Sequence, residues 1–415
     1  MSTPQEFFHQ RLSNGVELAI ERLPGRRTVA CDIRMLTGLV DEPDELLGLA
    51  HITEQTISKG TAEHSGQALS DAFDAMGIQH ASWVGRESFG FRYLCLPEYV
   101  GPAFDLHAEM LRLPSFPDES CQVAVALAGQ ELTALEDEPD ELARRELARQ
   151  AYGSRLGRHA LGNARTLRSI TRDHVSEFWR THFGAARLQV VLAGPLEPSR
   201  VVDQLERSFA GFGNPPDDGR LPRPIEFSPV RTHRHKELEQ EQIHMCWPGV
   251  PVQSDEFAVE RVLLAILSEG MSSRLFVEVR EKLGLVYWVG AWHEHPRSGG
   301  MIFVGASTTP QRCDETFGVL LREVDRLAED ITEDELRRAK RGLIARTETH
   351  GDITRAHAAE LASDLFYFGR PRPMAAKIAQ IEAVTADDVR GYLSRHPRDR
   401  LSVVTLGPRE LKAAG

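Results

Sequence analysis

Apolar residues recur along the chain with the spacing of short strands and amphipathic helices. Residues 16–21 alternate apolar and polar side chains after the turn dipeptide Asn14-Gly15, which predicts a β-hairpin. Residues 188–193 are almost continuously apolar and predict a buried strand. Because strand and helix patterns alternate throughout, we expect an α+β fold with antiparallel or mixed sheets.

Helical periodicity fills most of the first half between these strands. β-rich runs at 80–82 and 88–96 predict two further strands. Apolar spacing predicts helices over residues 48–58, 67–76, 100–113 and 117–150.

One pattern occurs twice, about half the chain apart. Residues 169–195 and 383–408 each place a threonine, Thr171 or Thr385, at a helix N-cap and continue as an amphipathic helix and a buried strand. This repeat predicts two homologous tandem domains, each a mixed or antiparallel sheet with helices packed on one face.

The boundary between the domains is predicted from a stretch that lacks periodicity. Residues 213–229 contain five prolines and no apolar repeat, which is typical of a linker. We therefore expect an N-terminal domain over residues 1–212 and a C-terminal domain over residues 230–415.

Composition and charge exclude several classes of protein. Hydrophobic residues make up 41% and charged residues 27% of the chain, as in ordinary globular proteins. The net charge of -12 disfavours nucleic-acid binding, and no apolar run reaches the ~18 residues that span a membrane. The five cysteines are scattered without a C-x-x-C pair, which indicates reduced thiols and a cytoplasmic location.

The segment Gly48-Leu49-Ala50-His51-Ile52-Thr53-Glu54-Gln55 carries the candidate chemistry. On a helix, His51, Glu54 and Gln55 lie on one face. A histidine with a glutamate three residues later can bind a metal and place a base beside the metal-bound water. Taken alone, this spacing is more often a solvated pair.

Further motifs make the chain similar to the pitrilysin/insulinase-type zinc peptidases, the inverzincins with the motif H-x-x-E-H. Residues 48–51 match the family's G-L-A-H, and residues 59–61 match its K-G-T. Glu131, ahead of the turn at residues 137–139, matches the helical glutamate that is the family's third zinc ligand. The resemblance implies Zn²⁺ bound by His51 and Glu131, with Glu54 as the general base.

The second half carries another block of this family over residues 270–287. Arg280 and Tyr287, seven residues apart, match the pair that holds the substrate carbonyl and the tetrahedral intermediate in family members. The resemblance therefore implies a zinc-dependent endopeptidase whose two domains close like a clamshell on an extended peptide in the cleft between them.

Two positions depart from the family pattern. Gln55 stands where the family has its second zinc-binding histidine, and a neutral amide oxygen is a poorer zinc ligand than an imidazole nitrogen. Ala124 stands where the family usually has a supporting glutamate. Zinc binding is therefore expected to be weakened or lost.

A compensating ligand is one hypothesis. His80 replaces an asparagine of the family on a strand that should border the site, so we consider it as a third metal ligand. The alternative is a cleft-lining or surface histidine that binds nothing. Three other histidines, His64, His107 and His182, fall on polar helix faces and are expected to be solvated.

Two functions follow from these residues. Glu54 and Glu131 favour an active zinc endopeptidase. Gln55 and Ala124 favour a catalytically impaired or inactive member that binds peptide as the partner subunit of a heterodimeric peptidase. A homodimer or a heterodimer with a related subunit is expected in either case. A purely structural scaffold is disfavoured by the spacing of the Arg/Tyr pair.

Overall fold

The computed structural model describes residues 5–213, 215 and 217–412, so residues 214 and 216 of the expected linker lie outside it. The chain forms two compact units. Unit 1 contains the described residues of 1–133, 158–222 and 350–373, and unit 2 contains those of 134–157, 223–349 and 374–415. The chain passes from unit 1 to unit 2 after Pro222, and each unit includes one segment from the other half of the sequence.

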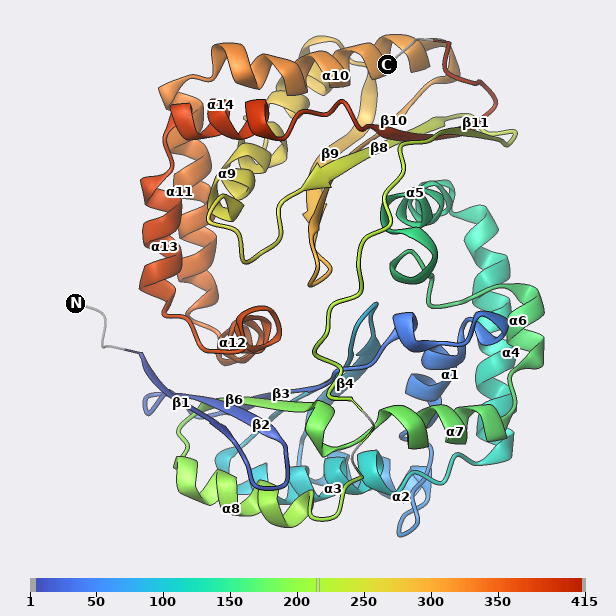
Figure 1. Ribbon diagram of the computed structural model, residues 1–415, viewed down its shortest axis with the longest axis vertical. Helices are drawn as coiled ribbons and strands as arrows, with labels where there is room; N and C mark the ends of the chain where they lie inside the picture. The colour runs from blue at the N-terminus through green and yellow to red at the C-terminus, as the bar shows by residue number, and fades with distance from the viewer. Residues whose placement is uncertain (1–4, 214, 216, 413–415) are drawn as a thin grey trace. The chain divides into compact units, whose positions relative to one another are not determined.

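Unit 1 is built on a six-stranded mixed sheet (Figure 1). Strand β2 pairs in parallel with β6, and the other neighbours pair antiparallel. In spatial order the strands are β1 (Glu6–Arg11), β2 (Glu17–Arg22), β6 (Leu188–Gly194), β3 (Val29–Met35), β5 (Phe89–Cys95) and β4 (Gln79–Val84).

Unit 2 has a five-stranded mixed sheet with the same pairing order, apart from the additional edge strand of unit 1. Its one parallel pair is β7 with β11. This matching topology confirms the α+β fold with two homologous units. In spatial order the strands are β7 (Arg231–His235), β11 (Ser402–Gly407), β8 (Glu241–Gly249), β10 (Gly300–Thr308) and β9 (Val286–Glu294).

The repeated helix–strand segment begins in the same way in both units. The Thr171 hydroxyl accepts a hydrogen bond from the His174 backbone N–H, and the Thr385 hydroxyl accepts one from the Asp388 backbone N–H. These caps satisfy N–H groups that have no partner within the helix. Helices α7 (Arg172–His182) and α14 (Ala386–Arg395) follow, and each leads to a buried strand, as the sequence pattern predicts.

Helices bury one face of the unit 1 sheet in a large apolar core, and α12 covers the opposite face against Ala19, Val191 and Ala193. Because both faces of the sheet are covered, every residue of β6 is buried. Besides α7, the helices of unit 1 are α1 (Leu49–Thr56), α2 (Gly66–Ala75), α3 (Val100–Arg112), α4 (Asp118–Ala134), α6 (Ala164–Ser169), α8 (Pro198–Ser208) and α12 (Thr354–Phe368).

Unit 2 repeats this arrangement. Helices pack on one face of its sheet, and α5 lies along β8 and β11 on the other, where the Tyr152 ring centroid is 6.0 Å from that of Phe303. Each sheet thus has one helix on its second face in addition to the helices expected on the first. Besides α14, the helices of unit 2 are α5 (Pro139–Leu156), α9 (Phe257–Ser268), α10 (Cys313–Asp330), α11 (Glu333–His350) and α13 (Met374–Ala383).

Two helices fill the helical pattern predicted over residues 117–150, and they are separated at the turn expected at residues 137–139. Helix α4 ends at Ala134, and α5 begins at Pro139 after one short 3-10 turn. Proline has no backbone N–H and clashes with the preceding turn of a helix, but it is accommodated in a first turn. Pro139 therefore starts a new helix, and this break separates the segment of unit 1 from that of unit 2.

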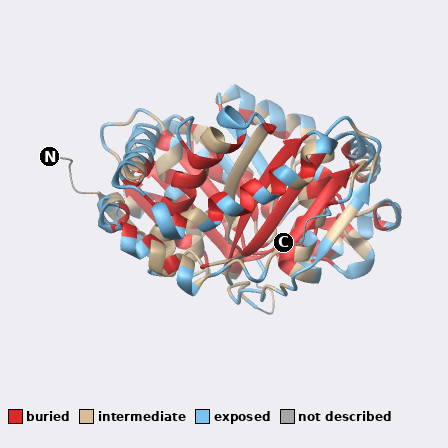
Figure 2. Cartoon of the chain, turned by 90° about the horizontal axis from the view of Figure 1, so that it is seen from above, coloured by how far each residue is buried: buried red, intermediate tan, exposed pale blue. Residues whose placement is uncertain are grey.

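Figure 2 shows buried strands and helices whose outer faces are exposed. All five cysteines are buried free thiols. Among the described residues, none of the helices combines the length and apolar character that crossing a lipid bilayer requires.

Candidate functional site

The helix that carries the H-x-x-E-Q motif starts at a defined cap. Gly48 adopts a left-handed backbone conformation with φ of 101°, which is favourable only for glycine. The buried Glu42 carboxylate accepts hydrogen bonds from the backbone N–H groups of Gly48 and Ala50 at 3.1 and 2.8 Å. Burial raises the pKa of Glu42 to about 8, against the lowering effect of these hydrogen bonds. The cap thus determines where α1 begins and orients its motif residues.

His51 and Glu131 are brought together in unit 1. His51 Nε2 on α1 lies 3.8 Å from Glu131 Oε2 on α4. A tetrahedral zinc ion lies about 2.0–2.2 Å from each ligand atom, so two of its ligand atoms lie roughly 3.3–3.6 Å apart. A small movement of the two side chains toward each other would therefore let one ion bind both.

Glu54 is buried and held by two neighbours. Its Oε2 atom accepts a hydrogen bond from Gln55 Nε2 at 2.6 Å, and its Oε1 atom accepts one from the Ser82 hydroxyl of β4. Both carboxylate oxygens thus already accept a hydrogen bond. Gln55, which stands where the family has its second zinc-binding histidine, thus donates its amide N–H to Glu54, the candidate base.

His80 is placed differently from His51 and Glu131. It is exposed on β4, and its ring centroid lies 4.6 Å from that of Phe73 on α2. Two groups of described residues bring three metal-ligating atoms within 4.8 Å of one another, and neither contains His51, Glu131 or His80. The structure therefore pairs two of the three candidate ligands and does not bring the third to them.

His107 is buried, so the prediction of a solvated side chain is wrong for it. Its ring stacks on Tyr93 with centroids 4.6 Å apart, and its Nδ1 atom lies 2.7 Å from the Ala103 carbonyl oxygen. Burial lowers the pKa of His107 to about 4. The packing of α3 on β5, which helical periodicity alone does not show, covers this position.

The donor set does not complete a three-ligand zinc site of the family type. Gln55 offers only an amide oxygen, and Ala124 is buried on α4 without any group that could support a ligand. His51 and Glu131 remain as a two-residue pair.

Arg280 and Tyr287 form a pair in unit 2. Arg280 lies in the π-helix Leu275–Lys282, and Tyr287 lies near the start of β9. The Arg280 guanidinium carbon is 5.4 Å from the Tyr287 ring centroid and 4.9 Å from that of Phe276. Tyr287 is 78% exposed, so this pair is a surface feature and not part of the core.

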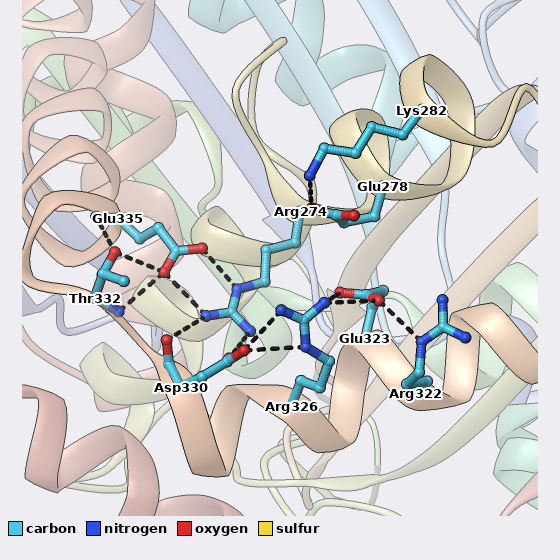
Figure 3. Close-up of polar contacts among 9 residues, drawn as sticks. All are labelled: Arg274, Glu278, Lys282, Arg322, Glu323, Arg326, Asp330, Thr332 and Glu335. Carbon is cyan, nitrogen blue, oxygen red and sulfur yellow. Dashed lines mark hydrogen bonds and ion pairs between the residues drawn. The ribbon is translucent and has the colours of Figure 1, made fainter.

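The π-helix that carries Arg280 is anchored by Arg274 (Figure 3). The Arg274 guanidinium donates to Asp330 at the end of α10 at 2.6 Å and to Glu335 in α11 at 2.7 and 2.9 Å. Its side chain is only 7% exposed. These hydrogen bonds to two carboxylates hold Arg274, the N-cap residue of the π-helix, against α10 and α11.

Ser82 and Arg274 were not among the residues expected at the site. Strand alternation provides a signal for Ser82, since residues 80 and 82 lie on the same face of β4. Arg274 lies in the same family block as Arg280, but its partners are about 60 residues away in sequence, so no local pattern indicates its role.

Comparisons with known proteins agree with this architecture. The family model of the insulinase family, peptidase family M16, matches residues 17–164, and that of the peptidase M16 inactive domain matches residues 169–343. Together they span most of the chain.

Similar proteins match along nearly the whole length. An uncharacterized zinc protease of Rickettsia felis is 26% identical over 98% of this chain and 99% of its own. An uncharacterized zinc protease of Streptomyces coelicolor is 29% identical over 97% of this chain and 90% of its own. A probable mitochondrial-processing peptidase subunit beta of Arabidopsis thaliana is 24% identical over 96% of this chain and 77% of its own.

Solved structures share the fold. A peptidase M16 inactive domain from Pseudomonas fluorescens superimposes with a TM-score of 0.88 at 19% identity, covering 98% of this chain and 99% of its own. A protease from Helicobacter pylori gives 0.88 at 16% identity, covering 97% and 100%. With both halves matched by models of one family, the chain belongs to the insulinase family of peptidases, peptidase family M16.

Proposed function

We propose that this chain is a peptide-binding member of its family whose own zinc-dependent hydrolysis is impaired, and that it acts with a related subunit. The observation that carries this proposal is the hydrogen bond from Gln55 Nε2 to Glu54 Oε2 at 2.6 Å. At that position an active site of this type needs an imidazole nitrogen on the metal.

The state of Glu54 supports the same conclusion. A general base must present a free lone pair to the proton that it removes. Gln55 and Ser82 each donate to one of the two carboxylate oxygens of Glu54. Each oxygen keeps a second lone pair, but these hydrogen bonds stabilise the carboxylate and so make Glu54 a weaker base toward water.

Peptide binding is supported by features of each unit. Strand β4 is an edge of the unit 1 sheet, and residues 79–82 on it are exposed. An edge strand can accept an extended peptide as a further strand through main-chain hydrogen bonds. In unit 2, the exposed Arg280 and Tyr287 offer a cation and a phenol hydroxyl that can bind a peptide carbonyl oxygen.

A second candidate function is a weak zinc endopeptidase. The 3.8 Å separation of His51 Nε2 and Glu131 Oε2 favours it, because two ligands of the expected type remain close to bridging distance. In this case His51 and Glu131 would hold the ion, and His80 could serve as the third ligand only if it left Phe73 and moved toward them. Bound zinc would supply an acidified water for attack on the peptide bond.

Cleavage of a quenched fluorescent peptide with added Zn²⁺ separates the two functions. We expect no chelator-sensitive cleavage by the purified protein and no difference between the wild type and Glu54→Gln. Binding of the same peptide, followed by fluorescence anisotropy, should persist in Glu54→Gln and weaken about tenfold or more in Arg280→Ala. Zinc-dependent cleavage that Glu54→Gln abolishes would contradict an impaired site and support the endopeptidase.

The substitution Gln55→His tests the cause of the impairment. A nitrogen donor at position 55 would restore the family's ligand set, so we expect the zinc content bound at this site to rise well above that of the wild type. Gln55→Ala is the matched control, because it releases Glu54 without adding a ligand. Equal zinc contents in Gln55→His and Gln55→Ala would show that another defect governs the site.

Partner and location are part of the proposal. The similar Arabidopsis thaliana protein is named as a subunit of a processing peptidase, which supports assembly with a related chain as a dimer. The buried free thiols are compatible with a reducing compartment, and we propose the cytoplasm. Co-purification with a related chain that carries an intact H-x-x-E-H motif would test the assembly.

A further inference from the structure

A buried carboxylate in unit 2 faces two imidazoles. Glu260 Oε1 on α9 lies 3.0 Å from His293 Nδ1 on β9 and 3.1 Å from His295 Nε2 just after it. The Glu260 side chain is inaccessible to solvent, and the side chains of His295 and His293 are 7% and 25% exposed. None of these residues belongs to the H-x-x-E-Q motif, which lies in unit 1.

We propose that Glu260, His293 and His295 form a second binding site for a divalent metal ion, with Zn²⁺ the best-suited ion. Two histidines and one glutamate are a ligand set that zinc accepts, with a fourth position left for water. The site goes beyond the proposed function, because it uses none of the residues that would bind peptide or the zinc of the motif.

The distances between the donor atoms suit a single ion. Ligand atoms at ~2.0–2.1 Å from a tetrahedral zinc lie roughly 3.3 Å from one another. The observed separations of 3.0 and 3.1 Å are hydrogen bonds in the absence of metal. An ion would replace them once each imidazole presents a lone pair at that nitrogen and the atoms move slightly apart. The His293 side chain is 25% exposed, so the cluster is in contact with solvent at this ligand.

Contacts outside the cluster orient Glu260 so that Oε1 faces the two imidazoles. Its other oxygen, Oε2, accepts hydrogen bonds from the Tyr392 hydroxyl at 2.5 Å and from the Val250 backbone N–H at 2.8 Å. Such outer-shell contacts orient metal-binding carboxylates and are part of a built site.

Gly249 and Phe257 lie against the cluster and leave space for its side chains. A Cβ atom at Gly249 would lie 2.5 Å from Glu260 Oε2, so glycine leaves room for the carboxylate. The Phe257 ring lies 5.4 Å from that of His293 and 4.9 Å from that of His295, and forms an apolar wall. An apolar surround strengthens the attraction between a cation and its ligands.

The second group of three ligating atoms in the described part of the chain lacks these features. Glu63, His64 and Glu109 contain one imidazole, and the His64 side chain is 39% exposed. This group is an ordinary surface contact between a histidine and acidic residues, so the proposal is confined to the cluster in unit 2.

Cobalt titration of the full-length protein tests the site. Co²⁺ reports tetrahedral coordination by visible absorption, and His51→Ala removes the motif in unit 1 from the measurement. We expect His51→Ala to bind one equivalent of Co²⁺ with this absorption and to show a higher unfolding temperature with Zn²⁺. Adding His293→Gln and His295→Gln to the His51→Ala protein should lower its affinity for Co²⁺ at least ~100-fold. The same changes should abolish the rise in unfolding temperature that Zn²⁺ causes.

Two further variants serve as controls for the cobalt titration. His235→Gln, at an exposed histidine beside Glu237, is the matched control and should leave cobalt binding unchanged. The single variant His293→Gln, at the more exposed ligand, covers the case in which the double change prevents folding. Absence of tetrahedral cobalt absorption in the folded His51→Ala protein would overturn the proposal. It would also be overturned if adding His293→Gln, alone or with His295→Gln, left the absorption of the His51→Ala protein unchanged.

Discussion

At the residue scale, one amide changes two properties of the candidate site. Gln55 withholds the imidazole nitrogen that zinc prefers, and its N–H donates to the carboxylate of Glu54. The first effect follows from the residue type and can be predicted from the sequence. The second depends on the side-chain conformation, which only the structure provides.

Glu17 on β2 is a residue whose charge state depends on folding. Hydrogen bonds from His9, Gln189 and Arg220 outweigh the effect of burial and lower the pKa of Glu17 to about 2. The ordinary pKa of a glutamate is about 4.3, so the unfolded chain binds this proton more readily than the folded chain. The stabilisation is complete above the ordinary pKa and is lost as the pH falls through the range from about 4.3 to 2.

We therefore expect Glu17→Gln to weaken the pH dependence of the free energy of unfolding in this acidic range. Urea unfolding at a series of pH values measures it. Glu237→Gln, at a side chain 87% exposed, is the control and should follow the wild type. Parallel curves for Glu17→Gln and wild type would contradict the role assigned to Glu17.

At the element scale, buried ion pairs hold short or irregular elements to regular ones. The π-helix that carries Arg280 has few turns of its own, and Arg274 fastens its start to α10 and α11. Arginine suits this position because its planar guanidinium can donate to two carboxylates at once (Figure 3).

Arg274→Met should lower the free energy of unfolding by about 2–3 kcal/mol, because it leaves Asp330 and Glu335 without their shared partner. Arg322→Met, which removes a 55% exposed arginine on α10, should cost less than about 0.5 kcal/mol. Chemical denaturation of both variants measures the difference, and equal losses would show that Arg274 is not an anchor.

At the scale of the whole molecule, the two halves of the sequence exchange one helix each. Helix α12 belongs to unit 1 and packs on β3 and β6, and α5 belongs to unit 2 and packs on β8 and β11. Neither half of the chain therefore contains all the elements of one unit. Folding of each unit requires segments that are far apart in sequence.

Separating the chain after Pro222 tests this interdependence. The fragment 1–222 lacks α12, so the apolar face formed by Ala19, Ala30 and Val191 would lie open to solvent. We expect this fragment alone to be poorly soluble or to lack a cooperative unfolding transition, and co-expression with 223–415 to restore both. Cooperative unfolding of the isolated fragment at the temperature of the full chain would contradict the prediction.

Much of the fold could be predicted from local patterns, whereas part of the site could not. The hairpin, the buried strands and the repeated capped helices follow from periodicity and from residues such as Thr171 and Thr385. The burial of His107 was missed, because the helical pattern around it does not show which neighbour packs there. Periodicity alone does not show the break at Pro139 either, and only the family motif indicates a turn at residues 137–139. The contact of His80, the hypothetical ligand, with Phe73 also depends on the packing of separate elements, which the sequence pattern does not show.

By itself, the sequence determined the class of fold, its duplication and the residue types available for chemistry, because periodicity, caps and side-chain chemistry are local properties. Only the tertiary structure decided which of these residues meet. It brought His51 to Glu131, joined Gln55 and Ser82 to Glu54, and gathered Glu260, His293 and His295. Distances between atoms of separate elements depend on how helices pack on sheets, and no local pattern contains that information.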